Sequence, residues 1–261
     1  MNIIDAFYID EQNIVVLFDQ KIRNEIRETN NYDDYFDFSR NNISVETVNK
    51  ISDNGILITL DKGVNLNNLK DTITIRRGGV RQELAGDVKI SNGTEYLVDK
   101  KLGVILEDNI NNNNTSVEFS NSVISNNDKI IFASFIINRT DSNNDNIDSI
   151  SISDLVNTSE ANGYGISITD TEFSIDKRNN SNITKLEEIE FTRDLNTNYQ
   201  VYLIIDTKRD KHYASITDID DPSSVPVTVM LEDDEYETFT HFFTHGDPGF
   251  AVDDIIIGVL E

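Results

Sequence analysis

Short runs in which apolar and polar residues alternate recur along the whole chain. In Tyr199–Asp206 every second residue is large and apolar, and the positions between them are half apolar as well, as in a strand covered on both faces. Such runs return about every ten to twenty residues with Asn, Asp or Gly between them, which is typical of sandwiches and jelly rolls. We therefore predict an all-β fold; residues 21–30 alone fit a short helix or a solvated loop equally well. The other predicted strands are Asn13–Phe18, Gly55–Leu60, Thr72–Ile75, Lys129–Ile137, Gly165–Ile168, Glu172–Asp176, Val225–Leu231 and Asp254–Leu260.

The composition favours strands and excludes several chemistries. Alanine is scarce, whereas Ile, Val, Thr, Tyr and Phe, which favour strands, and Asn, which favours turns, are frequent. No cysteine is present, so disulfides, thiolate metal sites, iron–sulfur clusters and cysteine nucleophiles are excluded. The longest apolar run, Ile130–Ile137, is far shorter than the roughly 18 residues of a membrane span. The first residues lack the basic and apolar regions of a signal peptide, so we expect a compact soluble protein.

Charge divides the chain into two parts. The 261 residues include 22 Lys and Arg against 47 Asp and Glu, a net charge of −25, which repels phosphate backbones and anionic membranes, so neither nucleic acid nor a membrane is an expected partner. Residues 1–105 carry 13 basic and 17 acidic residues, a net −4, and residues 106–261 carry 9 and 30, a net −21. With the Asn-rich run at 108–115 as the most turn-rich stretch, we predict two domains, 1–95 and 96–261. The boundary lies between about 95 and 115, and Tyr96–Leu106 fits either domain.

The first domain has a recognisable order of segments. An opening strand at Ile3–Ile9 is followed by Asn13–Ile22, Gly55–Val64, Thr72–Ile75 and a glycine-containing stretch at Gly78–Val80. This order resembles the bacterial immunoglobulin-like domains of surface-layer and adhesin proteins. The resemblance implies an Ig-like β-sandwich that serves as a spacer or a docking module.

The second domain is similar to another known architecture. Its segments Gly163–Ile168, Phe173–Lys177, Tyr199–Asp206, Tyr213–Ile216 and Gly249–Gly258 resemble a concanavalin-like jelly roll, in which a closing Asp-Asp-apolar strand returns beside the first strand. The resemblance implies a jelly-roll β-sandwich. It does not imply a function, because one fold can carry many different sites.

Motifs of catalysis are mostly missing. The chain has no G-x-S-x-G nucleophile elbow, Walker loop, dinucleotide fingerprint or H-E-x-x-H motif. The segment Glu188–Arg193 is similar to the E-x-D-x-x-E strand of laminarinase-like jelly rolls, but Arg193 stands where the third acid would be. A glycosidase needs both a proton donor and a second carboxylate. We therefore interpret Glu188 and Glu190 as part of a solvated polar strand edge and expect no enzymatic activity.

The three histidines are one candidate for metal binding. His241 and His245 share a face if their segment is extended, and Asp247 follows closely, so a His-His-Asp site is geometrically conceivable. The two phenylalanines between them indicate a strand directed at the core, and the histidines lie beside a turn, so a surface or turn role is favoured. The third histidine is His212.

Calcium is the better metal candidate, because it takes about six to eight oxygen ligands. One candidate site is the loop with Asp141, Asn143 and Asp145, which lacks the turn glycine and distal Glu of a helix-loop-helix site. The other is Asp253 and Asp254, which match the closing strand of jelly-roll carbohydrate modules, some of which hold structural calcium. An Asn/Asp-rich turn is the alternative for the loop, and a capping Asp beside a solvated one is the alternative for the strand. No other cofactor is expected.

Charged runs suggest where partners could dock. Arg76, Arg77 and Arg81 form the one concentrated positive patch, on a predicted hairpin of the less acidic domain. They could dock an acidic partner surface or the acidic domain of another copy, or form an ordinary charged turn. The acidic runs 218–221 and 232–237 flank the strand at Val225–Leu231 and are interpreted as solvated edges that discourage strand-to-strand aggregation.

Three classes of function compete: enzyme, lectin and structural module. A lectin would stack sugars on exposed Trp or Tyr, but Trp is absent and the nine Tyr form no clear stripe. An acidic, cysteine-free chain with an Ig-like and a concanavalin-like domain resembles the accessory structural proteins of tailed-phage virions. The resemblance implies a non-enzymatic capsid decoration or tail accessory protein, present in the virion in several copies, with residues 1–95 docked on capsid or tail proteins and 96–261 displayed. The alternative is a lectin-like module or adhesin for cell-surface glycans of the host, ahead of a polysaccharide-degrading enzyme.

Overall fold

Strands account for all the regular structure in the part of the chain that is described, so the all-β prediction is confirmed. Of the stretch 21–30 only residues 21–23 are described, and they are not helical. No helix within the described ranges has the length and apolar character needed to cross a membrane. The computed structural model describes residues 1–23, 32, 35–40, 42–76, 80, 95–110, 116–118, 124–125, 129–140, 147–154, 161–180, 182–236, 238–246 and 249–260.

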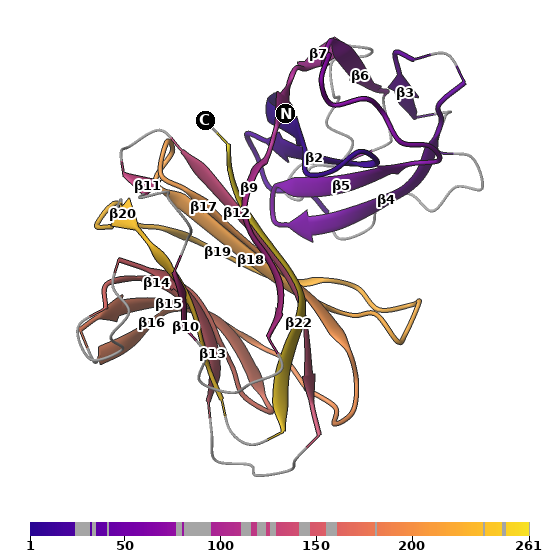
Figure 1. Ribbon diagram of the computed structural model, residues 1–261. Helices are drawn as coiled ribbons and strands as arrows, with labels where there is room; N and C mark the ends of the chain where they lie inside the picture. The colour runs from indigo at the N-terminus through magenta and orange to yellow at the C-terminus, as the bar shows by residue number, and fades with distance from the viewer. Residues whose placement is uncertain are drawn as a thin grey trace. The chain divides into compact units, whose positions relative to one another are not determined.

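The first unit, Met1–Leu102, has two sheets around one core (Figure 1), antiparallel except for the pair of β1 and β8. The larger sheet has the strand order β4-β5-β2-β1-β8, and the smaller has the order β3-β6-β7. Apolar residues from both, among them Ile14, Ile58 and Ile73, form a shared core, so the unit is a β-sandwich. Its strands are β1 (Ile3–Tyr8), β2 (Asn13–Phe18), β3 (Phe36–Phe38), β4 (Val45–Ser52), β5 (Gly55–Leu60), β6 (Asp71–Ile75), β7 (Glu95–Val98) and β8 (Lys100–Lys101).

The division between the units lies within the interval of about 95 to 115 that the sequence predicts. The second unit begins at Gly103, so residues 96–102 belong to the first unit and not to the second, where the predicted domain 96–261 has them. The reason is long-range pairing: β7 pairs antiparallel with β6, and β8 pairs parallel with β1. Tyr96–Leu106, which fits either domain by its sequence, is thus divided between them.

A buried carboxylate joins three segments of the first unit. Asp71 on β6 accepts a 2.8 Å hydrogen bond from Tyr8 Oη. It also accepts bonds of 2.5 and 3.0 Å from Nε and Nη2 of Arg40, which follows β3. Burial and the neighbouring carboxylate raise the pKa of Tyr8, so the hydroxyl remains a hydrogen-bond donor at all ordinary pH values.

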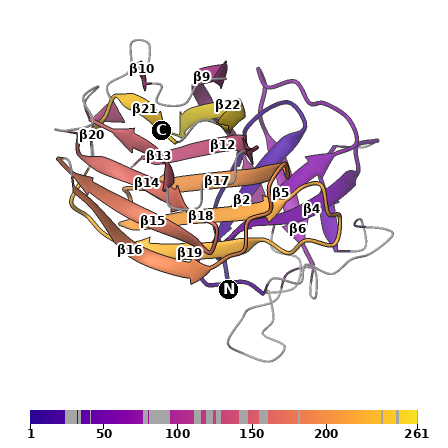
Figure 2. The ribbon, with the colours of Figure 1, turned by 90° about the horizontal axis from the view of Figure 1, so that it is seen from below.

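The second unit is a sandwich of two six-stranded antiparallel sheets (Figure 2). We call the sheet β10-β21-β13-β14-β15-β16 the front sheet and the sheet β19-β18-β17-β12-β22-β9 the back sheet. The chain passes between the sheets repeatedly, as in a jelly roll, and β22 returns beside both β12 and the first strand, β9. The strands are β9 (Gly103–Ile110), β10 (Ser116–Glu118), β11 (Ile124–Ser125), β12 (Ile130–Arg139), β13 (Asp148–Ser153), β14 (Gly163–Ile168), β15 (Glu172–Asn179), β16 (Asn182–Glu190), β17 (Tyr199–Asp206), β18 (Lys211–Asp218), β19 (Val227–Glu232), β20 (Thr238–Phe239), β21 (His241–His245) and β22 (Phe250–Leu260).

The core of this unit lies between the two sheets. Strand β14 lies across from β17, β15 from β18, and β16 from β19. In the central strands every second residue, such as Ile150, Ile166 and Leu203, enters one continuous apolar cluster, because side chains alternate between the faces of a strand. The residues between them therefore occupy the outer faces of the sheets.

One polar cluster lies inside the sandwich, around His212 on β18. The imidazole is 1% exposed, and its ring centre lies 4.1 Å from that of Tyr164. Its Nε2 lies 2.9 Å from the backbone oxygen of Asp233, whose carboxylate accepts hydrogen bonds from Tyr164 Oη and, at 2.7 Å, from Lys177 Nζ. In the described structure Nδ1 of His212 is buried without a hydrogen-bond partner. Burial lowers the pKa of His212 to about 4.

Candidate functional site

The predicted docking arginines are described only in part. Arg76 is exposed and forms a 3.0 Å ion pair with Asp37, which is exposed as well; such surface pairs contribute little to stability. Arg77 and Arg81 lie outside the described residues. A docking role for this hairpin stays a prediction.

The predicted calcium ligands are not brought together by the described structure. Asp141, Asn143 and Asp145 lie outside the described residues. Asp253 and Asp254 lie on β22 at an irregularity in its pairing with β12, where Asp254 has a φ of 50°. The described residues contain no group of three or more His, Cys, Asp or Glu able to hold a metal ion. The prediction of a calcium site at Asp253 and Asp254 therefore gains no support from the described residues.

The two neighbouring histidines differ in their surroundings. His241 is buried, with Nδ1 2.6 Å from Thr240 Oγ1, whereas His245 is exposed at the other end of β21. Both point to the outer face of the front sheet, as the alternation predicts, because Phe242 between them enters the core. Asp247, the third residue of the conceivable metal site, lies outside the described residues.

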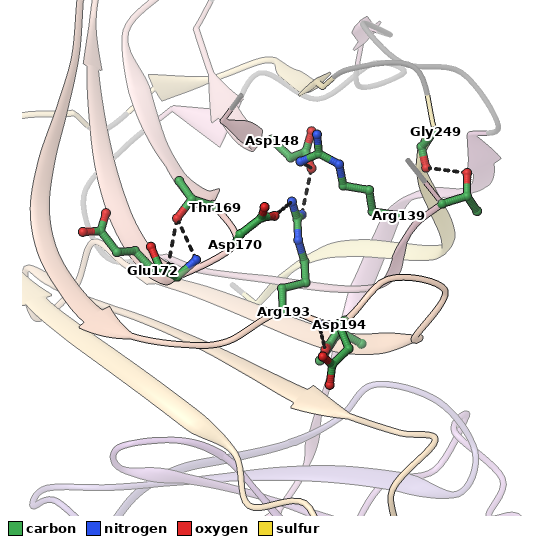
Figure 3. A network of polar contacts seen from close by, with 11 residues as sticks. Arg139, Asp148, Thr169, Asp170, Glu172, Arg193, Asp194 and Gly249 are labelled. Atoms are coloured by element: carbon green, nitrogen blue, oxygen red, sulfur yellow. Dashed lines mark hydrogen bonds and ion pairs between the residues drawn. The ribbon is translucent and has the colours of Figure 1, made fainter. Parts of the chain in front are cut away.

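The segment that is similar to a glycosidase strand has two different halves. Glu188 and Glu190 are exposed on β16, the edge strand of the front sheet, as predicted. Arg193, which the interpretation of a solvated edge did not cover, is buried and donates a 2.7 Å hydrogen bond to the buried carboxylate of Asp148 (Figure 3). Arg139 contacts the same carboxylate at 3.2 Å. Arg193 is thus part of an internal ion network, because one Asp attracts two guanidinium groups.

The outer face of the front sheet carries an unusual set of side chains, which we call the serine-lined face. Small residues alternate with core residues on its two central strands, and the flanking strands place larger polar and aromatic residues beside them. The face consists of Ser149, Ser151 and Ser153 on β13, Gly163, Gly165 and Ser167 on β14, Ser174, Asp176 and Arg178 on β15, and His241, Phe243 and His245 on β21.

The two glycines of this face are required by close approach of the backbone. A Cβ on Gly163 would lie 2.1 Å from the oxygen of Ile152, and one on Gly165 would lie 2.3 Å from the oxygen of Ile150. Without side chains there, Arg178 on β15 reaches across β14, so that its Nη2 donates a 2.7 Å hydrogen bond to Ser149 on β13.

Charge and an aromatic ring meet on this face. The guanidinium carbon of Arg178 lies 5.4 Å from the ring centre of Phe243, within reach of a cation–π attraction. Asp176 accepts hydrogen bonds from Ser167 and, at 2.7 Å, from Ser174. Burial raises the pKa of Asp176 and lowers the pKa of Arg178. The face therefore holds one acceptor and one donor group of opposite charge, each partly stripped of water.

Two polar atoms of the face have no hydrogen-bond partner within the described structure. They are Oγ of Ser151 and Nε2 of His241, and both are buried. A buried polar atom without a partner costs about 1–3 kcal/mol and calls for an explanation such as a bound ligand. The outer face of the back sheet differs, because apolar side chains such as Phe132, Ile204 and Tyr213 are buried there.

Sequence reasoning missed this face, although a signal for it exists. The segments Asp148–Ser153 and Gly163–Ile168 both alternate small residues with large ones, which is the pattern of a strand with a core face and an uncrowded outer face. Arg178 and Phe243 have no such signal, because their meeting with Ser149 and Ser151 depends on strand register.

Comparisons with known proteins find solved structures that resemble part of this chain in fold but have low sequence identity to it. No protein-family model and no curated protein matches the sequence. Among solved structures, the carbohydrate-binding module CBM66 from Bacillus subtilis covers 59% of this chain and 93% of its own at 13% identity, with a TM-score of 0.43. The Lotus tetragonolobus seed lectin covers 61% and 93% at 12% identity with a TM-score of 0.41. The Bauhinia forficata lectin in complex with GalNAc covers 57% and 82% at 11% identity with a TM-score of 0.45. All three TM-scores are below 0.5, and no function is carried over from these proteins.

Proposed function

We propose that the second unit, a sandwich of the concanavalin-like kind, is a non-enzymatic glycan-binding module and that the serine-lined face is its ligand site. The observation that carries the proposal is the pair of unpartnered buried atoms, Ser151 Oγ and His241 Nε2, beside a guanidinium, a carboxylate and an aromatic ring. A sugar ring needs this combination, because its hydroxyl groups both donate and accept hydrogen bonds while its C–H face is apolar.

Each group has a role that follows from its chemistry. Arg178 forms one hydrogen bond with another described residue, and its guanidinium has five N–H donors. Asp176 is a hydrogen-bond acceptor and Phe243 an apolar ring, and they are 2% and 8% exposed. A sugar that gains access to the face can use them to hold adjacent hydroxyl groups and its ring face. The face contains a single buried carboxylate, Asp176, whereas glycoside hydrolysis commonly uses two. This supports binding without turnover.

A glycan array probed with the purified full chain, with and without calcium, tests the proposal. The best ligand is then measured by isothermal titration calorimetry against Ser151→Ala and Arg178→Gln. Loss of one hydrogen bond predicts about three- to tenfold weaker binding for Ser151→Ala and a larger loss for Arg178→Gln. Ser215→Ala, a buried serine of the back sheet, is the matched control and should bind like the wild type. The proposal is wrong if no glycan binds, or if both variants of the face bind unchanged.

The role of the first unit and the place of the protein in a virion are a separate proposal. The Ig-like assignment is supported by the two-sheet sandwich whose last strand, β8, runs parallel to β1. Docking through this unit on capsid or tail proteins stays a prediction from the sequence. Co-sedimentation of the purified protein with particles that lack it tests this role, and absence of binding would remove it without affecting the glycan proposal.

A further inference from the structure

A cavity of about 290 Å³ opens in the second unit beside the end of β16, and none of its lining residues belongs to the serine-lined face. Four segments contribute to it: the end of β16 with the residues after it, the start of β17, the end of β18, and the loop that leads into β19. The lining residues are Glu190, Phe191, Thr192, Asp194, Tyr199, Ile216, Asp218, Ser224, Val225 and Val227.

The cavity has an apolar floor and an exposed apolar side chain at its mouth. Phe191, Tyr199 and Ile216 are buried members of the sandwich core, and the rings of Phe191 and Tyr199 meet edge to face at 5.4 Å. Val225 is 53% exposed, an unfavourable position for an aliphatic side chain unless something covers it. The floor is therefore part of the packed core of the sandwich.

The rim of the cavity is acidic and lacks a positive charge. Glu190, Asp194 and Asp218 line it, and no lysine, arginine or histidine does. The carboxylates of Glu190 and Asp194, both exposed, form no hydrogen bond or ion pair with another described residue. The nearest cation in the sequence, Arg193, is committed to Asp148 and Asp170.

We infer that this cavity is a docking site for a basic segment of a partner protein, a lysine or arginine next to an aliphatic residue. The methylene stem of such a side chain packs on the apolar floor, while its charged end stays at the hydrated rim. There it can form ion pairs with the carboxylates of Glu190 and Asp194. The aliphatic neighbour covers Val225. The net charge of −21 on residues 106–261 steers a basic segment toward the unit and repels an acidic one.

The inference is independent of glycan binding, because the two sites share no residue. The probe is a fluorescein-labelled, end-capped peptide of alternating valine and lysine, and its binding to the full chain is measured by fluorescence polarisation at low salt. The comparison peptide replaces each lysine by glutamate. We expect saturable binding of the basic peptide and none of the acidic one.

Variants distinguish binding of the peptide at the cavity from non-specific electrostatic attraction to the acidic protein. The double variant Glu190→Gln, Asp194→Asn should bind about fivefold more weakly, and Val225→Ser should bind a few-fold more weakly because apolar cover is lost. The double variant Glu46→Gln, Glu95→Gln removes two exposed charges from the first unit and should change the dissociation constant less than twofold. The inference is overturned if the control weakens binding as much as the cavity variants, if no variant has an effect, or if no binding is seen up to about 1 mM peptide.

Discussion

Acidification should destabilise the second unit through one buried histidine. His212 has its pKa lowered by burial from 6.5 to about 4, so the folded state keeps the imidazole neutral over a range of pH in which the unfolded state binds a proton. The contribution of His212 to the unfolding free energy is therefore fully present above about pH 6.5 and is lost as the pH falls from there toward 4.

The magnitude follows from the shift. Each pKa unit corresponds to 1.36 kcal/mol, so lowering the pH from 7 to 4.5 should remove about 2–3 kcal/mol of unfolding free energy. Burial is the largest cause of the lowered pKa, with Tyr164 lying against the ring, and nearby Lys177 also disfavours a second positive charge. The hydrogen bond to the backbone oxygen of Asp233 and the Asp233 carboxylate raise the pKa and so oppose part of this effect.

The assay is urea unfolding followed by circular dichroism at several pH values for the wild type and His212→Gln. Glutamine can keep a donor toward Asp233 but does not titrate, so the variant should have a flatter dependence on pH by about 2 kcal/mol over this range. His245→Gln, which changes an exposed histidine on β21, is the matched control and should behave like the wild type. Equal pH dependence of the wild type and His212→Gln, or an NMR titration that places the pKa of His212 near 6.5, would refute the reasoning.

Three further substitutions test the described packing. Asp148→Ala leaves two buried guanidinium groups without their shared carboxylate, and thermal unfolding should report about 3–5 kcal/mol of lost stability; a loss below about 1 kcal/mol would contradict the network in Figure 3. Gly165→Ala should cost about 1–3 kcal/mol because its Cβ would meet backbone. Gly103→Ala, whose Cβ would lie 3.4 Å from the nearest atom, is the control for this substitution and should be tolerated. Asp71→Asn should lower the stability of the first unit by about 1–3 kcal/mol in urea unfolding, and an unchanged midpoint would show that Tyr8 and Arg40 do not depend on this carboxylate.

Alternation in the sequence was sufficient to predict several of the strands, although it missed others such as β4 and β13. Tyr199–Asp206 has the bounds of β17, and the run at Lys129–Ile137 falls on β12, because the side-chain period of a strand is a local property. The closing strand was predicted from Asp254, but β22 begins at Phe250. The irregular pairing near Asp254 interrupts the alternation, so the sequence pattern does not extend the strand back to Phe250.

Tertiary structure decided where the chain divides and which side chains meet. Residues 96–102 belong to the first unit because β7 and β8 pair with strands far back in the chain, and no local pattern encodes such pairing. Arg193 follows the exposed carboxylates of β16 in the sequence, yet it is buried and paired with Asp148. The sequence by itself determined the all-β class, several of the strands, the absence of thiol chemistry and the uneven charge. The serine-lined face and the acidic cavity exist only through register and burial, because each is assembled from residues that only neighbouring strands bring together.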